Sequence, residues 1–257
     1  MSKNTAGRLT DGNLFELFSG IQGEGLYVGE RQIFVRLTGC NLNCPFCDTS
    51  QAWISADTAC VEQTAGRRDF LPIPNPIDAA SLVERIVQLD DSCPIHHSVS
   101  ITGGEPLVQG KFVTELAWGL KESNRRVFLE TNGTLPDALR EAIPYIDIIS
   151  MDIKLPESAS DVNLFATHEQ FLRIAAGADV YVKVVVTDSS SSSDIVQAAE
   201  MVSRVDPDIP LIVQPVTAQS GVVSPPAAKI LEWQAECKRY LRRVRVIPQC
   251  HKIMGQL

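Results

Sequence analysis

Three cysteines within eight residues are the strongest chemical signal in the sequence. They are Cys40, Cys44 and Cys47, in the segment Cys-Asn-Leu-Asn-Cys-Pro-Phe-Cys. Three thiolates from one loop can hold a four-iron cluster and leave one iron free to bind a cofactor. The same residues are also compatible with inert buried thiols, or with a structural zinc site that takes a fourth ligand. The candidates for that ligand are Cys60, His96 and His97.

Polar clusters follow several of the apolar runs that the sequence predicts as strands. These clusters begin at Thr102, Glu130, Asp152 and Gln214, each at the end of such a run. In folds built from parallel strands, function gathers where the strands end, because the carboxyl ends meet at one edge of the sheet. The pattern therefore predicts a single site built by many loops.

Short β-branched runs alternate with stretches of helical spacing along the chain, which indicates an α/β fold. The predicted strands are 32–37, 98–102, 126–130, 146–151, 180–186, 211–214 and 244–247, and the predicted helices are 77–89, 112–121, 168–176, 195–205 and 227–241. Asp194 is expected to be an N-cap, and Pro136 is expected to open a short helix. The alternation implies parallel strands joined by right-handed crossovers, in an open doubly wound sheet or in a full or partial barrel.

The composition is that of a globular protein. The chain has 257 residues, of which 44% are hydrophobic and 21% charged, so disorder, collagen and coiled coil are disfavoured. The net charge of -8 has the wrong sign for broad phosphate neutralisation, so we expect no direct nucleic-acid partner. With no long apolar run and a polar start, we expect no membrane span and no signal peptide. The seven cysteines are an odd number, and three of them are crowded into eight residues. In a chain that starts without a leader this pattern favours metal or redox chemistry over a disulfide framework, so we expect a cytoplasmic location.

The cysteine spacing, with Phe46 directly before the last cysteine, resembles the cluster loop of the radical S-adenosylmethionine (SAM) enzymes. The segment Gly103-Gly104-Glu105-Pro106 is similar to the glycine-rich turn that these enzymes place at the methionine end of SAM. The resemblance implies a modified, incomplete (β/α) barrel of the radical SAM type, in which the open iron of a [4Fe-4S] cluster binds SAM. We expect one radical SAM domain over 1–257, with a surface insertion at about 55–76.

Five further segments resemble the 7-carboxy-7-deazaguanine synthase family, namely 21–25, 34–37, 39–42, 47–49 and 248–252. The resemblance implies a lyase that converts 6-carboxy-5,6,7,8-tetrahydropterin to 7-carboxy-7-deazaguanine with loss of ammonia, in the 7-deazapurine pathway that leads to queuosine in tRNA. The implied cofactors are the [4Fe-4S] cluster, SAM and Mg²⁺, with SAM regenerated in each turnover. The implied partners are the pterin substrate, a one-electron donor of the flavodoxin or ferredoxin type, and a second copy of the chain in a homodimer.

The resemblance also assigns roles to single residues, and it assigns no catalytic side chain, because the radical is generated on SAM. Cys40, Cys44 and Cys47 match the cluster ligands, and Thr49 matches the magnesium ligand. The residues that match the cofactor site are Phe46, Asp48, Gly103, Gly104, Glu105, Glu130, Asn132, Ser150, Asp152, Lys154 and Gln214. Those that match the substrate site are Ile21, Gln22, Gly23, Glu24, Arg36, Thr102, His251 and Leu257.

Two of these assignments have an equally simple alternative. Arg36 is expected to face the substrate carboxylate with its guanidinium fork, but the residue alone fits a surface salt bridge equally well. Leu257 is expected to close the substrate pocket at the C-terminus, where the alternative is a frayed chain end.

Two other functions share part of the pattern. A radical SAM activase that installs a glycyl radical on a partner protein needs the three cysteines and the glycine turn, but not the segments 22–25 and 249–252. A noncatalytic zinc-binding interaction module needs a fourth ligand beside the three cysteines. The two segments favour the synthase over the activase. A zinc protein is colourless and an iron-sulfur protein is brown, so the colour of the purified protein separates the zinc-binding module from the synthase.

Overall fold

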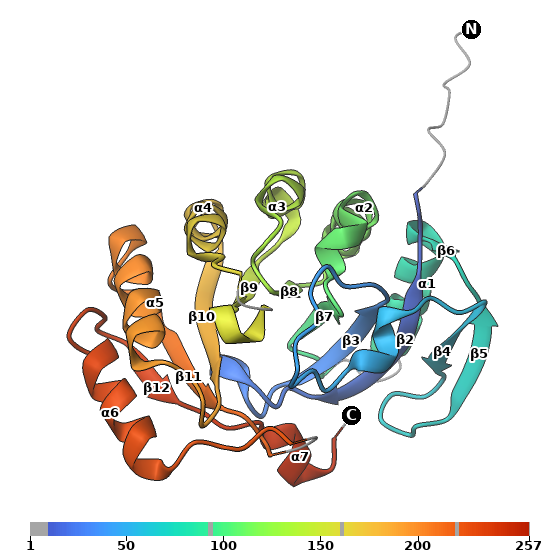
Figure 1. Ribbon diagram of the computed structural model, residues 1–257. Helices are drawn as coiled ribbons and strands as arrows, with labels where there is room; N and C mark the ends of the chain where they lie inside the picture. Colours follow the sequence, from blue (N-terminus) through green and yellow to red (C-terminus); the bar gives the residue numbers. More distant parts are fainter. Residues whose placement is uncertain (1–9, 92–94, 160–161, 219–220, 257) are drawn as a thin grey trace, which may run out of the picture.

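The computed structural model describes residues 10–91, 95–159, 162–218 and 221–256. A ten-stranded sheet runs through the molecule (Figure 1). In spatial order its strands are β12 (Val244–Val246), β11 (Leu211–Pro215), β10 (Asp179–Val186), β9 (Ile148–Ile153), β8 (Val127–Thr131), β7 (Ser98–Gly103), β3 (Arg31–Leu37), β2 (Leu14–Ile21), β4 (Thr58–Glu62) and β5 (Phe70–Pro74). The short strands β1 (Asp11–Gly12) and β6 (Ile77–Asp78) pair separately.

The seven strands from β3 to β12 are all parallel, and they follow one another in chain order across the sheet. Each crossover therefore advances the sheet in the same direction, which curls it toward a barrel. The outermost strands, β12 and β5, do not pair with each other in the described part of the chain. The prediction of an incomplete (β/α) barrel is confirmed.

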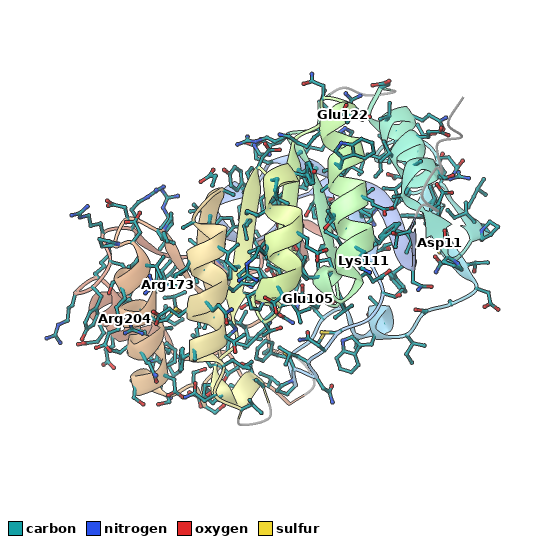
Figure 2. The ribbon with its side chains drawn as sticks, turned by 90° about the horizontal axis from the view of Figure 1, so that it is seen from above. Asp11, Glu105, Lys111, Glu122, Arg173 and Arg204 are labelled. Atoms are coloured by element: carbon teal, nitrogen blue, oxygen red, sulfur yellow. The ribbon has the colours of Figure 1, made fainter. Side chains whose placement is uncertain are left out.

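Helices connect the parallel strands and cover one face of the sheet. They are α1 (Ala79–Asp91), α2 (Gly110–Glu122), α3 (Pro136–Ala142), α4 (Phe165–Ala175), α5 (Ser192–Val205) and α6 (Ala227–Cys237). Figure 1 shows α2, α3 and α4 above the sheet and the short C-terminal α7 (Cys250–Met254) below it. Seen from above in Figure 2, the helices lie side by side, with Lys111 at one end of α2 and Glu122 at the other. Short 3-10 turns follow strands at η1 (Gly25–Tyr27), η2 (Ser50–Trp53), η3 (Pro106–Gln109) and η5 (Pro156–Ser158), and η4 (Ile143–Tyr145) directly follows α3.

The period of two along each strand divides its side chains between two environments. One set packs under the helices and forms the main core, with Val35, Ile101, Leu129, Ile149 and Val184 all buried. The alternate set faces the inside of the open barrel. Because several of its members are polar, the barrel interior is suited to hold a ligand.

The predicted parallel strands all exist, with ends that differ by a few residues. Two elements differ from the predictions. The segment 55–76 is more than a surface insertion, because it forms the antiparallel pair β4–β5 that extends the sheet beyond β2. The N-cap of α5 is Ser191 and not Asp194, which lies in the first turn, where its charge favours the positive end of the helix dipole. Pro136 opens α3 as predicted.

No helix among residues 10–91, 95–159, 162–218 and 221–256 is long and apolar enough to cross a membrane.

Candidate active site

A cavity of about 390 Å³ lies inside the open barrel at the carboxyl ends of the parallel strands. Strand register brings its polar residues together: Arg36 of β3 is opposite Thr102 of β7, and Lys183 of β10 is opposite Asp152 of β9. With the exception of Glu105 and Leu257, every site residue expected from the sequence lines this cavity. Leu257 lies outside the described residues. The prediction of one site built by many loops matches this arrangement.

The loop after β3 carries Cys40, Cys44 and Cys47 into the cavity wall. The turn after β7 packs directly against it, and a Cβ added at Gly104 would collide with the Gly39 carbonyl oxygen and with Cys40 Cβ. Glycine is therefore required at residue 104 for the close approach of the two loops. The turn after β7 is therefore held directly beside the three-cysteine loop.

The positions of the thiols do not suit a single zinc ion. Zn–S bonds of about 2.3 Å require sulfur ligands less than about 4 Å apart. Among the described residues, the group of three possible ligand atoms within 4.8 Å of one another is Glu24, Asp48 and His251, and it contains none of the three cysteines. An iron-sulfur cluster is larger than a single ion and is held by thiolates, so the chemistry of these three donors favours a cluster over zinc.

The expected fourth zinc ligands also lie elsewhere. Cys60 is exposed on β4, and neither His96 nor His97 lines the cavity. The buried ring of His96 is 2.8 Å from Asp90 Oδ1 and 2.8 Å from Ser19 Oγ. These contacts give His96 a structural role.

Glu105 differs from the expected contact with the cofactor. Its side chain is fully buried, and it accepts hydrogen bonds from Leu107 N at 3.0 Å, Thr131 Oγ1 at 2.9 Å and Asn132 N at 2.6 Å. Burial raises the pKa of the Glu105 carboxyl to about 7, against the opposing effect of these donors. Glu105 therefore joins the glycine turn to the loop after β8. Asn132 in that loop donates to Asn41 Oδ1 at 2.9 Å and so reaches the cysteine loop.

A hydrogen-bonded network forms a second part of the cavity wall. Gln22 Nε2 donates to Glu130 Oε1 at 2.7 Å, and Thr102 Oγ1 donates to Glu130 Oε2 at 2.9 Å. Arg36 Nε donates to Glu16 Oε1 at 2.7 Å, in an ion pair whose side chains are largely buried. Arg36 thus forms a salt bridge, as the alternative interpretation predicts. The salt bridge lies in the cavity wall and not on the open surface.

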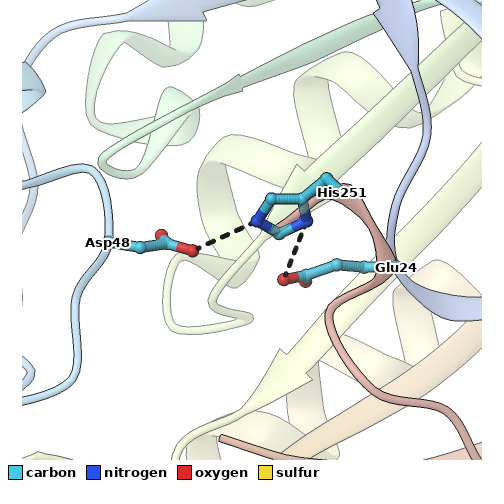
Figure 3. Close-up of side chains that lie close together, drawn as sticks. All are labelled: Glu24, Asp48 and His251. Carbon is cyan, nitrogen blue, oxygen red and sulfur yellow. Dashed lines mark ion pairs between the residues drawn. The ribbon is translucent and has the colours of Figure 1, made fainter. Parts of the chain in front are cut away.

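The C-terminal segment covers this wall. Cys250 N donates to the Gly23 carbonyl oxygen at 2.8 Å, and Gln249 Nε2 donates to Glu24 Oε1 and to Asp48 Oδ2, both at 3.0 Å. Figure 3 shows His251 between the same two carboxylates, with Nδ1 4.0 Å from Glu24 Oε1 and Nε2 3.8 Å from Asp48 Oδ2. The segment 248–252 and the segment 22–25, which are far apart in sequence, therefore form one surface.

Charged residues join the two walls. Burial alone would raise the pKa of Glu24, but the charge and hydrogen bond of Lys183 and the bond from Gln249 lower it to about 2. Lys154 Nζ donates to Asp152 Oδ2 at 2.9 Å and lies 5.7 Å from the centroid of the Phe46 ring in the cysteine loop.

Two side chains in the cavity have polar atoms without partners. Both amide atoms of Gln214 and Oδ1 of Asp152 are buried and lack hydrogen bonds within the described residues. Unpaired buried polar atoms are costly. Their presence on the side of the cysteine loop is typical of a site that a polar ligand completes.

The sequence interpretation missed several cavity residues, including Lys183, Phe34, Trp53, Val185 and Val216. The apolar ones resemble ordinary core residues, and no local signal separates them. Lys183 did carry a signal, because a lysine interrupts the otherwise apolar strand Val-Tyr-Val-Lys-Val-Val-Val. Lysine is rarely buried without a partner.

Comparison with known proteins agrees with this geometry. Residues 34–187 match the model of the Radical SAM superfamily. The chain is 42% identical to the 7-carboxy-7-deazaguanine synthase of Geobacter sulfurreducens, over 95% of this chain and 97% of that one. It is 37% identical to the protein of the same name from Methanothermobacter thermautotrophicus, over 94% and 96% of the two chains.

A search of solved structures gives the same fold. The crystal structure of QueE from Escherichia coli superposes with a TM-score of 0.59 at 20% identity, and covers 94% of this chain and 95% of that one. The family model and the full-length relatives together identify the chain as a member of the 7-carboxy-7-deazaguanine synthase family within the radical SAM superfamily.

Proposed function

We propose that the chain converts 6-carboxy-5,6,7,8-tetrahydropterin to 7-carboxy-7-deazaguanine and ammonia. The observation that carries this proposal is the cavity itself, which the segments 22–24 and 249–251 line together with the three-cysteine loop, and in which Gln249 bridges Glu24 and Asp48. The relatives that match the whole chain are named for that product. A cluster and SAM bound at the cysteine loop supply the one-electron chemistry that removes a hydrogen atom from the substrate.

The residues around the cysteine loop divide the work of holding this cofactor. Cys40, Cys44 and Cys47 would hold the cluster. The unpaired amide of Gln214 and the free oxygen of Asp152 offer a donor and acceptors to the amino and carboxylate groups of SAM. At Gly104 the absent side chain lets the turn after β7 pack against Gly39 and Cys40, which would fix the turn beside the same ligand.

The opposite wall binds and orients the pterin. The guanidinium of Arg36, fixed through Nε by Glu16, directs its remaining N–H groups at the substrate carboxylate. Glu24 is ionised at neutral pH and accepts hydrogen bonds from the amino and ring N–H groups of the pterin. Gln22 and Thr102 donate to Glu130 and so join this wall to a residue that the sequence assigns to the cofactor site.

Thr49 supplies the protein oxygen for Mg²⁺. A hard cation prefers oxygen ligands and keeps several waters, so its other oxygens would come from water and the substrate. Thr49→Val removes the hydroxyl and preserves the shape of the side chain. The expected result is a rise of at least about tenfold in the Mg²⁺ concentration that gives half-maximal turnover, with unchanged iron content. An unchanged Mg²⁺ dependence would remove Thr49 from this role.

The broader setting of the enzyme is also part of the proposal. A flavodoxin- or ferredoxin-type protein donates the electron, the active form is a homodimer, and the enzyme works in the cytoplasm without contacting tRNA. The net charge of -8 supports the absence of a nucleic-acid partner.

Anaerobic incubation tests the reaction directly. The reconstituted protein is mixed with SAM, a reductant, Mg²⁺ and the carboxylated pterin, and the products are measured by mass spectrometry. The expected result is 7-carboxy-7-deazaguanine in many turnovers per SAM, with SAM recovered intact. Cys44→Ala is the control and should give no product. A protein that retains its brown cluster and cleaves SAM, but leaves the pterin unchanged, would contradict the proposal.

A further inference from the structure

Lys183 lies in the middle of β10, on the strand face that points into the cavity. Its neighbours Val182 and Val184 are fully buried on the opposite face, and only 12% of the Lys183 side chain is exposed. A buried ammonium group is unfavourable unless carboxylates compensate for its lost hydration. The contacts of its Nζ atom therefore indicate what the residue does.

Two carboxylates from different walls of the cavity surround the Lys183 ammonium. Nζ donates to Glu24 Oε2 and lies 3.5 Å from Asp152 Oδ2. The same Asp152 oxygen accepts a hydrogen bond from Lys154 Nζ at 2.9 Å. Glu24, Lys183, Asp152 and Lys154 thus form a chain of alternating charges.

This chain crosses the cavity from the proposed pterin side to the proposed cofactor side. At one end Glu24 contacts the C-terminal Gln249. At the other end Lys154 lies over the Phe46 ring of the cysteine loop. The segment around Glu24 also rests directly on β10, since a Cβ added at Gly25 would collide with the Tyr181 ring.

We infer that Lys183 is a positioning residue that fixes Glu24 and Asp152 together, so that binding of the pterin and binding of SAM favour each other. The inference rests on the proposed function. Each carboxylate retains some freedom, with 20% of Glu24 and 14% of Asp152 exposed. A ligand that orders one of them also orders Lys183, and thereby the other, which gives a coupling free energy between the two sites.

Binding measurements test this coupling without turnover. The Kd of the pterin is measured anaerobically with the cluster left oxidised, in the presence and absence of SAM. In the wild type, SAM should lower the Kd of the pterin by at least about fivefold. In Lys183→Met the Kd should rise by about tenfold or more, and the effect of SAM should fall below about twofold. Lys183→Arg, which keeps the charge, should restore part of both effects.

A double-mutant cycle separates positioning from simple stabilisation. If Lys183 acts through Glu24, the variant E24Q/K183M should bind the pterin no more weakly than E24Q alone. It should also be more stable to heat than K183M, because no buried carboxylate remains unpaired. The double variant also keeps the test valid if K183M fails to fold. Lys229→Met is the matched control, since Lys229 forms an ion pair with Asp188 that is largely exposed, and it should behave like the wild type.

Two results would overturn the inference. One is a K183M protein with a wild-type Kd for the pterin, and the other is a SAM effect that persists in K183M. Failure of the proposed function has a different signature, because the wild-type protein would then not convert the pterin at all.

Discussion

His168 on α4 is buried behind the loop that follows β8. Its Nε2 atom is 3.1 Å from the Asn132 carbonyl oxygen, and its Nδ1 atom has no hydrogen-bond partner within the described residues. Nε2 therefore carries the proton that is donated to Asn132. Because Asn132 is bonded to Asn41 beside Cys40, this histidine supports the loop that would hold the cluster.

The burial of His168 predicts a pH dependence of stability. Burial lowers the pKa of His168 to about 4 from the ordinary 6.5, against the opposing hydrogen bond to Asn132. A lowered histidine pKa means that its contribution is complete above pH 6.5 and declines as the pH falls toward 4. Between pH 7 and pH 5 the loss should be about 2 kcal/mol. Denaturant unfolding of wild type and His168→Gln at both pH values measures it, and equal pH dependence in the two proteins would refute the assignment.

The close packing around Gly104 predicts what a substitution at this residue does to SAM affinity and stability. A methyl group there must displace the Gly39 carbonyl or Cys40, so Gly104→Ala should reduce SAM affinity by about tenfold or more and cost about 1–3 kcal/mol of stability. Gly177→Ala is the control, because its Cβ would meet only the Ile174 carbonyl oxygen at 3.4 Å. Calorimetry on the reconstituted proteins gives the SAM affinity. Wild-type SAM affinity in Gly104→Ala would show that this turn does not face the cofactor.

At the scale of elements, the strand and helix pattern was predictable where hydrophobic periodicity alone determines the structure. The parallel strands are buried on both faces and read as apolar runs. Strand β2 was not predicted, because Glu16, Ser19 and Gly20 interrupt the alternation of apolar and polar residues along it. The β4–β5 hairpin escaped because Pro72 and Pro74 are unfavourable within strands and are tolerated only at a sheet edge, which is where β5 lies.

The site was predictable as a set of motifs and not as a set of contacts. The cysteine loop and the tail segment are recognisable because chemistry fixes their residue types. The direction of a side chain depends on tertiary packing. For that reason Glu105 belongs to the recognised turn but points into the protein, whereas Lys183 belongs to no motif and points into the cavity.

The β4–β5 hairpin and the C-terminal segment form a contact that predicts a role for the hairpin. Arg68 Nη2 donates to the Gly255 carbonyl oxygen at 2.8 Å. The backbone of Arg68 is held by Glu62, whose Oε1 accepts from Arg68 N at 2.6 Å and whose Oε2 accepts from Ser19 N at 2.8 Å. The hairpin thus links β2 to the C-terminal segment that covers the proposed pterin side of the cavity.

Arg68→Ala should loosen this cover. The variant loses one hydrogen bond of about 1 kcal/mol, which should speed amide exchange of residues 250–256 about fivefold. The KM for the pterin should rise by a similar factor, and the SAM affinity should change little. Arg67→Ala in the same turn is the control. Hydrogen-exchange mass spectrometry makes the measurement. Unchanged exchange in Arg68→Ala would mean that the tail is held by Gly23 and Gln249 alone.

At the scale of the whole molecule, the open barrel brings together segments that lie far apart in the sequence. The segment at Gln22 and the segment at Gln249 form one wall, and the loops after β3, β7 and β8 form the other. Because β12 and β5 do not pair within the described residues, backbone hydrogen bonds do not close the circle. Ligands that contact both walls would supply cohesion that the sheet lacks.

Ligands should therefore stabilise the cluster-loaded chain as a whole. A ligand at 100 times its Kd adds about 2.7 kcal/mol to the free energy of unfolding, which for a chain of this length corresponds to a rise in Tm of about 5–10 °C. Anaerobic calorimetry should show this shift with SAM and a further shift with the pterin. Cys44→Ala, which cannot hold the cluster by three thiolates, should show no shift with SAM, because SAM binding would require the cluster. An equal SAM shift in Cys44→Ala would place the SAM site away from the cysteine loop.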